Sequence, residues 1–219
     1  RSFDHVIVAF PGHSVVWMAY LLFGNRIIFD VFVSLYNSIV EDRSRHGKIM
    51  SLKYFFLDWF SMRLAKTILI DTKAHCDFLS EKFSINKKKF LVVPVGSDDS
   101  VVYPVDGTHK SEHFVVHFHG TGVPLQGVEY IKGAAEILEG QGVNFHFYGV
   151  KGLNTSNTVF LDRFHYTDMS QVISGSDVVL GIFGNTEKAR LVVPNKVYEG
   201  WATKKSVITS DTPAIREVA

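Results

Sequence analysis

Short apolar runs alternate with amphipathic stretches along the whole chain. The runs are rich in Val, Ile and Phe and are bounded by turn residues, which is typical of buried strands. Expected strands cover residues 5–10, 26–33, 67–71, 90–96, 114–119, 143–148, 158–164, 177–183 and 206–209. Expected helices cover residues 14–23, 48–66, 73–83, 128–139, 168–174, 195–203 and 213–218. Thr72 is a candidate N-cap for the third of these helices.

A polar stretch near the middle of the chain interrupts this alternation. It contains Pro104, Asp106 and Gly107, which are typical of a linker. Because strands alternate with helices on both sides, the pattern predicts an α/β protein with two Rossmann-like domains, each built on a parallel sheet. We expect domains at 1–98 and 113–219 and a linker at 99–112. In such sheets, ligands bind beyond the carboxyl ends of the strands.

Composition narrows the class of protein. Hydrophobic residues make up 46% of the 219 residues and charged residues 21%, which favours a packed core over disorder. The formal net charge of +1 gives no overall field for nucleic acid, so we expect no nucleic-acid partner. A single cysteine, Cys76, excludes an internal disulfide and suits a reducing compartment. We therefore expect a cytoplasmic protein, with the inner face of the membrane as an alternative location.

The segment richest in candidate ligand-binding residues follows the expected strand at 177–183. It begins with a glycine-rich turn, and Pro194 then stands where the next helix should begin. The N–H groups and partial positive charge of such a helix start suit a phosphate. Charged and amide side chains follow the turn or occupy the helix start, namely Lys188, Arg190, Asn195, Lys196 and Glu199. An ordinary strand-to-helix connection with solvated lysines would have the same composition.

Several of these motifs resemble the donor-binding half of family-4 (group 1) GT-B glycosyltransferases. The resemblance lies in DVVLGIFG at 177–184, VPNKVYE at 193–199 and SVITSDTPAIRE at 206–217. Looser similarity lies in PVG at 94–96 and in GTGVPLQG at 120–127. The resemblance runs through nearly the whole chain and is more specific in its second half. It also implies that the start of the N-terminal domain and the C-terminal tail are missing.

The resemblance implies a retaining transferase that moves a sugar from a nucleotide-diphosphate sugar to an acceptor hydroxyl. Glu199 would hold the ribose, and Asn195 and Lys196 would lie by the diphosphate. The acceptor would be a carbohydrate or a lipid-linked glycan, and no metal or other cofactor would be obligatory. The expected donor-binding residues are Gly120, Gly122, Gly149, Gly181, Phe183, Gly184, Lys188, Arg190, Asn195, Lys196 and Glu199.

Three positions depart from the family pattern. Leu191 stands eight residues before Glu199, where the family often has a glutamate, and Thr121 and Gln126 stand near the family's Arg and Lys positions. An inactive donor-binding homologue, or an inactive fragment, therefore stays open. Two other hypotheses are a nucleotide-sugar 2-epimerase of the same fold and a two-domain solute-binding protein.

The first half of the chain offers candidates for acceptor contact. His13 follows the first expected strand and Asp30 interrupts the second. Both are candidate catalytic residues, with Asp30 able to orient or deprotonate a hydroxyl. Ser34, Asp42 and Arg43 resemble the acceptor-side stretch of a subset of the family. Purely local hydrogen bonding would explain Asp30 equally well.

Two further features have more than one interpretation. His113, His117 and His119 lie close together in the sequence, and His117 and His119 would share one face of a strand, which fits metal ligation. Packing in the strand or the cleft is favoured because no cysteine or obvious carboxylate accompanies them in the same segment. The helix expected at 48–66 has a dense aromatic face. We expect this face to pack in the core, and peripheral membrane contact is the open alternative.

Overall fold

The computed structural model describes residues 3–41, 47–106 and 111–219, which form two compact units. The first unit contains Arg1–Pro94, Thr186–Val193 and Thr212–Ala219, and the second contains Val95–Asn185 and Pro194–Asp211. Two segments from the second half of the sequence therefore pack with the first unit. The linker expected at 99–112 assumes that each domain is one continuous stretch of the sequence, whereas each unit here combines separate segments. The expected domain boundaries stay a prediction.

The first unit is built on a parallel sheet with the strand order β1-β2-β3-β4. Its strands are Val6–Val8, Ile27–Asp30, Thr67–Ile70 and Phe90–Val92. Its α-helices are α1 (Val16–Phe23), α2 (Lys48–Leu64), α3 (Lys73–Lys82) and α6 (Glu187–Leu191). Phe29, Ile68, Met62 and Leu79 are fully buried where the helices cover the sheet. Burial of such side chains contributes about 1.5–3 kcal/mol each.

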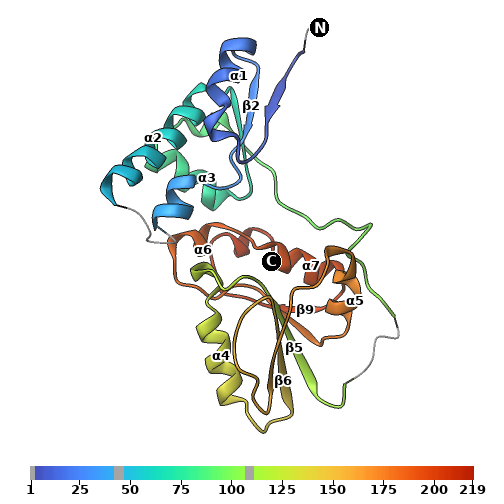
Figure 1. Ribbon diagram of the computed structural model, residues 1–219. Helices are drawn as coiled ribbons and strands as arrows, with labels where there is room; N and C mark the ends of the chain where they lie inside the picture. Colours follow the sequence, from blue (N-terminus) through green and yellow to red (C-terminus); the bar gives the residue numbers. More distant parts are fainter. Residues whose placement is uncertain (1–2, 42–46, 107–110) are drawn as a thin grey trace. The chain divides into compact units, whose positions relative to one another are not determined.

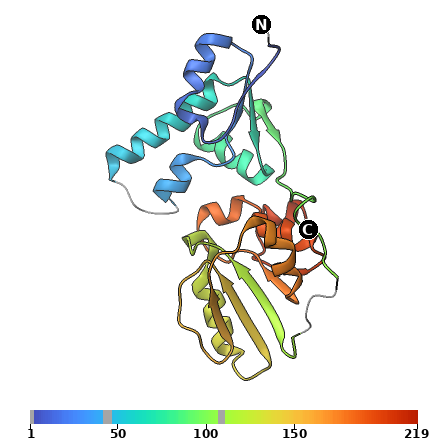
Figure 2. The same ribbon diagram turned by 45° about the vertical axis from the view of Figure 1, so that its right-hand side comes forward.

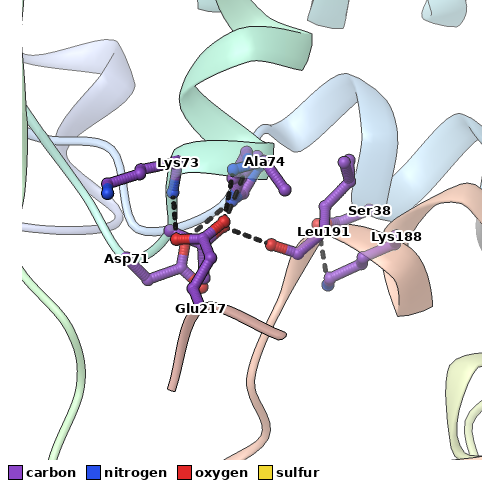
Figure 3. Close-up of polar contacts among 9 residues, drawn as sticks. Ser38, Asp71, Lys73, Ala74, Lys188, Leu191 and Glu217 are labelled. Carbon is purple, nitrogen blue, oxygen red and sulfur yellow. Dashed lines mark hydrogen bonds and ion pairs between the residues drawn. The ribbon is translucent and has the colours of Figure 1, made fainter. Parts of the chain in front are cut away.

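The start of α3 joins three distant parts of the chain within this unit. As the sequence predicts, Thr72 caps the helix, and its Oγ1 accepts a hydrogen bond from the amide of His75 at 3.0 Å. The same hydroxyl donates to the carbonyl of Leu191. The carboxylate of Glu217 accepts from the amides of Lys73 and Ala74 at 2.7 and 2.8 Å (Figure 3). A negative charge at this end of a helix is stabilising.

The second unit is built on a parallel sheet with the order β7-β6-β5-β8-β9. These strands are Thr158–Leu161, Val143–Tyr148, Phe114–His119, Val178–Leu180 and Ser206–Ile208. Figure 1 shows helix α4 (Val128–Ile137) on one side of this sheet and α5 (Met169–Ser174) and α7 (Asn195–Ala202) on the other. The chain leaves β5 towards β6 and later returns to β8 on its other side. The carboxyl ends of β5 and β8 therefore form the switch point at which such sheets bind ligands.

The predicted fold class is confirmed, since both sheets are parallel and alternate with helices. Several short elements escaped prediction, among them 3-10 helices at Lys87–Lys89, Pro124–Gln126 and Tyr166–Asp168. The five-residue helix α6 carries too little periodic pattern to be recognised. A π-helix at Tyr36–Glu41 begins where the carboxylate of Asp58 accepts from the amides of Leu35 and Tyr36, which is a tertiary effect. Among the described residues, no helix combines the length and apolarity needed to cross a bilayer.

Two loops meet backbone to backbone at the carboxyl edge of the second sheet. The amides of Phe183 and Gly184 donate to the carbonyls of Gln126 and Leu125 at 3.2 and 3.1 Å. A Cβ on Gly127 would lie 2.5 Å from the amide nitrogen of Gly184, and one on Gly184 would lie 2.4 Å from the carbonyl oxygen of Pro124. Gly127 also has a φ of +59°. This close approach therefore requires glycine at both positions.

We predict that Gly127→Ala destabilises the second unit more than Gly140→Ala does. Gly140 also has a positive φ, +76°, but a Cβ there meets nothing within 4 Å. Both variants incur the left-handed backbone penalty of about 1–2 kcal/mol, and only Gly127→Ala adds a clash with backbone. Urea unfolding of the two variants measures the difference. Equal losses of unfolding free energy would contradict the proposed packing of the loops.

Candidate functional site

The carboxyl edge of the second sheet gathers most of the expected donor-binding residues. Each glycine or aromatic of the set directly follows or closely follows a strand of this sheet. They are Gly120 and Gly122 after β5, Gly149 after β6, and Gly181, Phe183 and Gly184 after β8. Helix α7 starts at Asn195, with Pro194 as its N-cap residue, and supplies Lys196 and Glu199. The structure therefore brings these nine residues together in one unit.

Gln126 closes the loop after β5 on itself. Its side-chain oxygen accepts hydrogen bonds from the amides of Thr121 and Gly122 at 3.0 and 2.8 Å. The carboxamide thus occupies backbone donors that a glycine-rich loop could offer to a phosphate. A positively charged side chain at the position of Gln126 would not accept these bonds. This departure from the family pattern consequently has a structural role.

A chain of hydrogen bonds links β5 to α7. His117 Nε2 lies 2.8 Å from His119 Nδ1, and His119 Nε2 lies 2.9 Å from Glu199 Oε2. The side chains of His119 and Glu199 are 17% and 10% exposed, and His117 is fully buried. The His117 end of this hydrogen-bond chain therefore lies in the core, and at the other end His119 holds the largely buried carboxylate of Glu199 in place.

The carboxylate determines which nitrogens carry protons. Because an ionised Glu199 only accepts, Nε2 of His119 must donate, and the Nδ1 of a neutral His119 then accepts from Nε2–H of His117. Burial, followed by the nearby His119 and Lys196, holds the pKa of His117 well below its usual value. His117 is therefore neutral at pH 7, and a neutral imidazole with its proton on Nε2 can donate this hydrogen bond to His119.

Lys196 is buried at the start of α7. Its Nζ lies 4.1 Å from the centroid of the Phe118 ring, and burial lowers its pKa to about 7 against a smaller opposing effect of Glu199. Within the described part of the chain, this nitrogen has no hydrogen-bond partner. Asn195, the preceding residue, is exposed. A buried ammonium that lacks an acceptor, in the first turn of a helix, suits an anionic ligand.

A hollow of about 260 Å³ adjoins this edge of the sheet. Its lining includes His119, Tyr148, Arg163, Phe164 and Tyr166. The ring of Phe164 packs edge-on against the rings of Tyr148 and His119, with distances between ring centroids of 5.2 Å and 5.8 Å. Flat aromatic walls beside a guanidinium suit a planar ring with polar edges.

Sequence reasoning did not select Arg163, Phe164 or Tyr166. The available signal was their position at and after the end of the strand expected at 158–164. A larger hollow of about 590 Å³ lies beside His113 and His146, at the amino end of the same sheet. Because ligands of such sheets bind at the carboxyl ends, the smaller hollow is the better candidate.

The remaining two expected donor residues belong to the first unit. Lys188 and Arg190 lie on α6, and Nζ of Lys188 donates to the hydroxyl of Ser38 at 2.9 Å (Figure 3). Arg190 is exposed. These residues therefore lie in a different unit from Lys196 and Glu199, and their predicted role at the donor stays a prediction.

In the first unit, His13 and Ser34 converge on Asp58, a residue that sequence reasoning missed. Ser34 Oγ donates to the carboxylate of Asp58 at 2.6 Å, and His13 Nε2 lies 3.3 Å from it. All three residues are buried. Burial lowers the pKa of His13 to about 4 and raises that of Asp58 to about 6, against the hydrogen bonds that Asp58 accepts. At pH 7, the pair is therefore a neutral imidazole beside an ionised carboxylate.

The other acceptor-side candidates have different surroundings. Asp30 ends β2 and is half-buried at the carboxyl edge of the first sheet, which leaves part of its surface accessible. Asp42 and Arg43 lie outside the described residues. Among the candidates on the acceptor side that the structure describes, Asp30 is thus the residue whose position best suits contact with a ligand.

The histidines considered for metal binding are used in other ways. His117 and His119 hydrogen-bond to each other, while His113 lies before the start of β5. Within the described ranges, no group of three or more His, Cys, Asp or Glu side chains is arranged to hold a metal ion. The geometry favours a network that positions Glu199.

Comparison with known proteins gives structural matches only. No protein-family model matches the sequence, and no curated protein matches it. Sucrose-phosphate synthase from Thermosynechococcus elongatus is similar with 11% identity and a TM-score of 0.76, over 97% of this chain and 57% of that one. Anabaena Alr3699/HepE in complex with UDP-glucose is 14% identical with a TM-score of 0.70, over 95% of this chain and 59% of that one.

A third similar structure is the pneumococcal O-GlcNAc transferase GtfA in complex with UDP and GlcNAc. It is 17% identical with a TM-score of 0.63, over 95% of this chain and 42% of that one. The chain thus spans less than two thirds of each of these three proteins. At such identities, the likeness establishes the fold: this chain has the two-sheet α/β architecture of GT-B glycosyltransferases.

Proposed function

We propose that the chain is part of a retaining glycosyltransferase of family 4 (group 1), and that its second unit binds a nucleotide-diphosphate sugar. The observation that carries this proposal is the buried Nζ of Lys196, which lacks an acceptor in the described structure and lies one turn before the restrained carboxylate of Glu199. Among the similar structures, HepE is a complex with UDP-glucose and GtfA a complex with UDP and GlcNAc, which supports the same ligand class here.

We assign residues at the sheet edge to the four parts of such a donor, which are the diphosphate, the ribose, the base and the transferred sugar. The first-turn amides of α7 and the ammonium of Lys196 would bind the diphosphate, since both carry positive charge. Glu199 would accept hydrogen bonds from the ribose hydroxyls. The aromatic hollow beside Phe164 and Arg163 would hold the base, and the backbone at Gly181 to Gly184 would face the sugar.

In the transfer step, the acceptor hydroxyl oxygen bonds to the anomeric carbon, and the bond from that carbon to the diphosphate oxygen breaks. The hydroxyl proton passes to a basic oxygen, for which Asp30 is our candidate on this chain. The departing diphosphate gains negative charge, which Lys196 and the start of α7 would stabilise. Retention at the anomeric carbon is part of the proposal and rests on the family resemblance. We take the acceptor to be a glycan or a lipid-linked glycan.

An inactive donor-binding homologue is the second candidate. It is favoured by Gln126, whose carboxamide closes the first loop where the family often supplies a cation to the diphosphate. Nucleotide-sugar binding with neither transfer to any acceptor nor hydrolysis would select it. Conversion of the nucleotide sugar to its 2-epimer, without an acceptor, would select the 2-epimerase.

We predict that the affinity for UDP falls as the pH rises from about 6.5 to 8.5. The pKa of Lys196 is lowered to about 7 in the free protein, and a bound diphosphate would raise it. Binding would therefore take up a proton near pH 8, and the stabilisation would be complete below pH 7 and lost above the pKa of the complex. Isothermal titration calorimetry in two buffers of different ionisation enthalpy measures this uptake.

The variant that tests Lys196 is Lys196→Met, which should bind UDP about 10–100-fold more weakly and without proton uptake. Lys205→Met, on the same unit and half-buried, should retain both the affinity and the uptake. A pH-independent affinity in the unmodified protein, or an unchanged Lys196→Met variant, would contradict the role of Lys196.

We predict that Glu199→Gln weakens binding of UDP-glucose by about tenfold or more, because a carboxylate accepts hydrogen bonds more strongly than an amide does. The amide can still accept a bond from His119, so the fold should be retained, and circular dichroism would verify this. Glu136→Gln, an exposed control on α4, should bind as the unmodified protein does. If the folded Glu199→Gln variant kept full affinity, Glu199 would not be the ribose ligand.

A further inference from the structure

Two aromatic side chains lie together at the carboxyl edge of the first sheet. Strands β1 and β2 run parallel as neighbours (Figure 2), and Phe10 and Phe32 each stand two residues after the end of one of them. Their rings meet edge to face, with 5.6 Å between the ring centroids and 62° between the ring planes. The two residues are 36% and 37% exposed. This pair, the aromatic platform, thus presents apolar surface at the edge where parallel sheets bind ligands.

The backbone at Phe32 is strained. Its φ of +48° lies in the left-handed region, which a residue with a bulky side chain rarely adopts. Ser84 and Lys204 also have positive φ values, but each directly follows the C-cap residue of a helix, where this conformation is common. Phe32 instead lies in a three-residue turn, which the hydrogen bond from the amide of Val33 to the carbonyl of Val31 closes. Such strain at the edge of a sheet is typical of residues that contact a ligand.

Buried side chains hold the aromatic platform in place. The ring of Phe10 packs edge-on against His13, and His13 packs edge-on against Phe29, with distances between ring centroids of 6.0 and 4.9 Å. His13 and Phe29 are buried, so the core sets the orientation of Phe10. Asp30 is half-buried at the end of β2, two residues before Phe32. A carboxylate and two aromatic rings therefore share one edge of the sheet.

We propose that the aromatic platform binds the apolar face of a pyranose ring of the acceptor, and that Asp30 accepts a hydrogen bond from a hydroxyl of that ring. A pyranose with equatorial hydroxyls presents only C–H groups on its faces, and these polarised hydrogens are attracted to the negative face of an aromatic ring. Its hydroxyls lie at the rim of the ring, where they can donate to a carboxylate. A sugar bound there would be the acceptor of the proposed transferase, so the role of this site rests on that proposed function.

A quaternary ammonium is the main alternative ligand, because such cations also bind aromatic rings beside a carboxylate. Each residue of the platform keeps more than a third of its surface exposed. This suits a flat ring that lies across both side chains better than a compact cation, which is recognised by an enclosing aromatic cage. Tetramethylammonium is therefore the competing probe.

Saturation-transfer NMR with methyl β-D-glucopyranoside tests the proposal. When the aromatic protons of the unmodified chain are irradiated, the axial hydrogens that share one face of the sugar should receive more saturation than the methyl group. Phe10→Leu and Phe32→Leu should each weaken binding about three- to tenfold in a titration of the sugar, because leucine keeps the apolar character and removes the ring. Asp30→Asn should weaken it about threefold, because an amide accepts hydrogen bonds less strongly than a carboxylate does.

A matched control lies on helix α2. Phe56 and Trp59 also form an edge-to-face pair, with 5.5 Å between the ring centroids, and Phe56 is 59% exposed. The aromatic face of this helix, which the sequence analysis expects in the core, is thus partly on the surface. Phe56→Leu should leave glucoside binding unchanged, since this ring lies on a helix and not at the carboxyl edge of a sheet. Circular dichroism would verify that each variant folds.

Four results would overturn the proposal. They are absence of saturation of the glucoside by the unmodified chain, full binding by both Phe10→Leu and Phe32→Leu, an equal loss in Phe56→Leu, and saturation of tetramethylammonium in place of the glucoside. UDP is absent from this experiment, so the two proposals fail separately. Glucoside binding by a chain that does not bind UDP would contradict the proposed function, whereas UDP binding without glucoside binding would overturn the aromatic platform alone.

Discussion

A buried positive charge without an acceptor is the constraint on which the candidate site depends. Burial of an ammonium is costly, and the protein limits the cost through the ring of Phe118, the nearby Glu199 and a pKa lowered to about 7. An anion at the start of α7 would remove much of this cost. Under the proposed function, the diphosphate would supply the interaction that the described side chains do not supply.

The surrounding backbone makes this arrangement possible. Gly127 and Gly184 let the loops after β5 and β8 touch, and Gln126 fixes the first of these loops through its amides. The hydrogen bonds from His117 through His119 then restrain Glu199. Loop geometry and side-chain orientation are therefore set before a ligand arrives, which reduces the entropy lost on binding.

The sequence predicted the architecture well because periodicity and turn residues report local structure. Both parallel sheets, the cap at Thr72 and the helix start after Pro194 follow from patterns within a few residues. The sequence could not show that Lys196 and Glu199 are buried, or that His119 bridges 80 positions to reach Glu199, because these are tertiary facts. It likewise gave no reason to select Asp58, which organises His13 and Ser34 from a distant helix.

The most direct test of the account is a crystal structure of this chain with UDP bound. We expect the diphosphate to lie within hydrogen-bond distance of Lys196 Nζ and of the first-turn amides of α7, and a ribose hydroxyl to donate to Glu199. The base should lie against Phe164. A nucleotide bound elsewhere, or one bound at this edge while Lys196 still lacks an acceptor, would contradict the account.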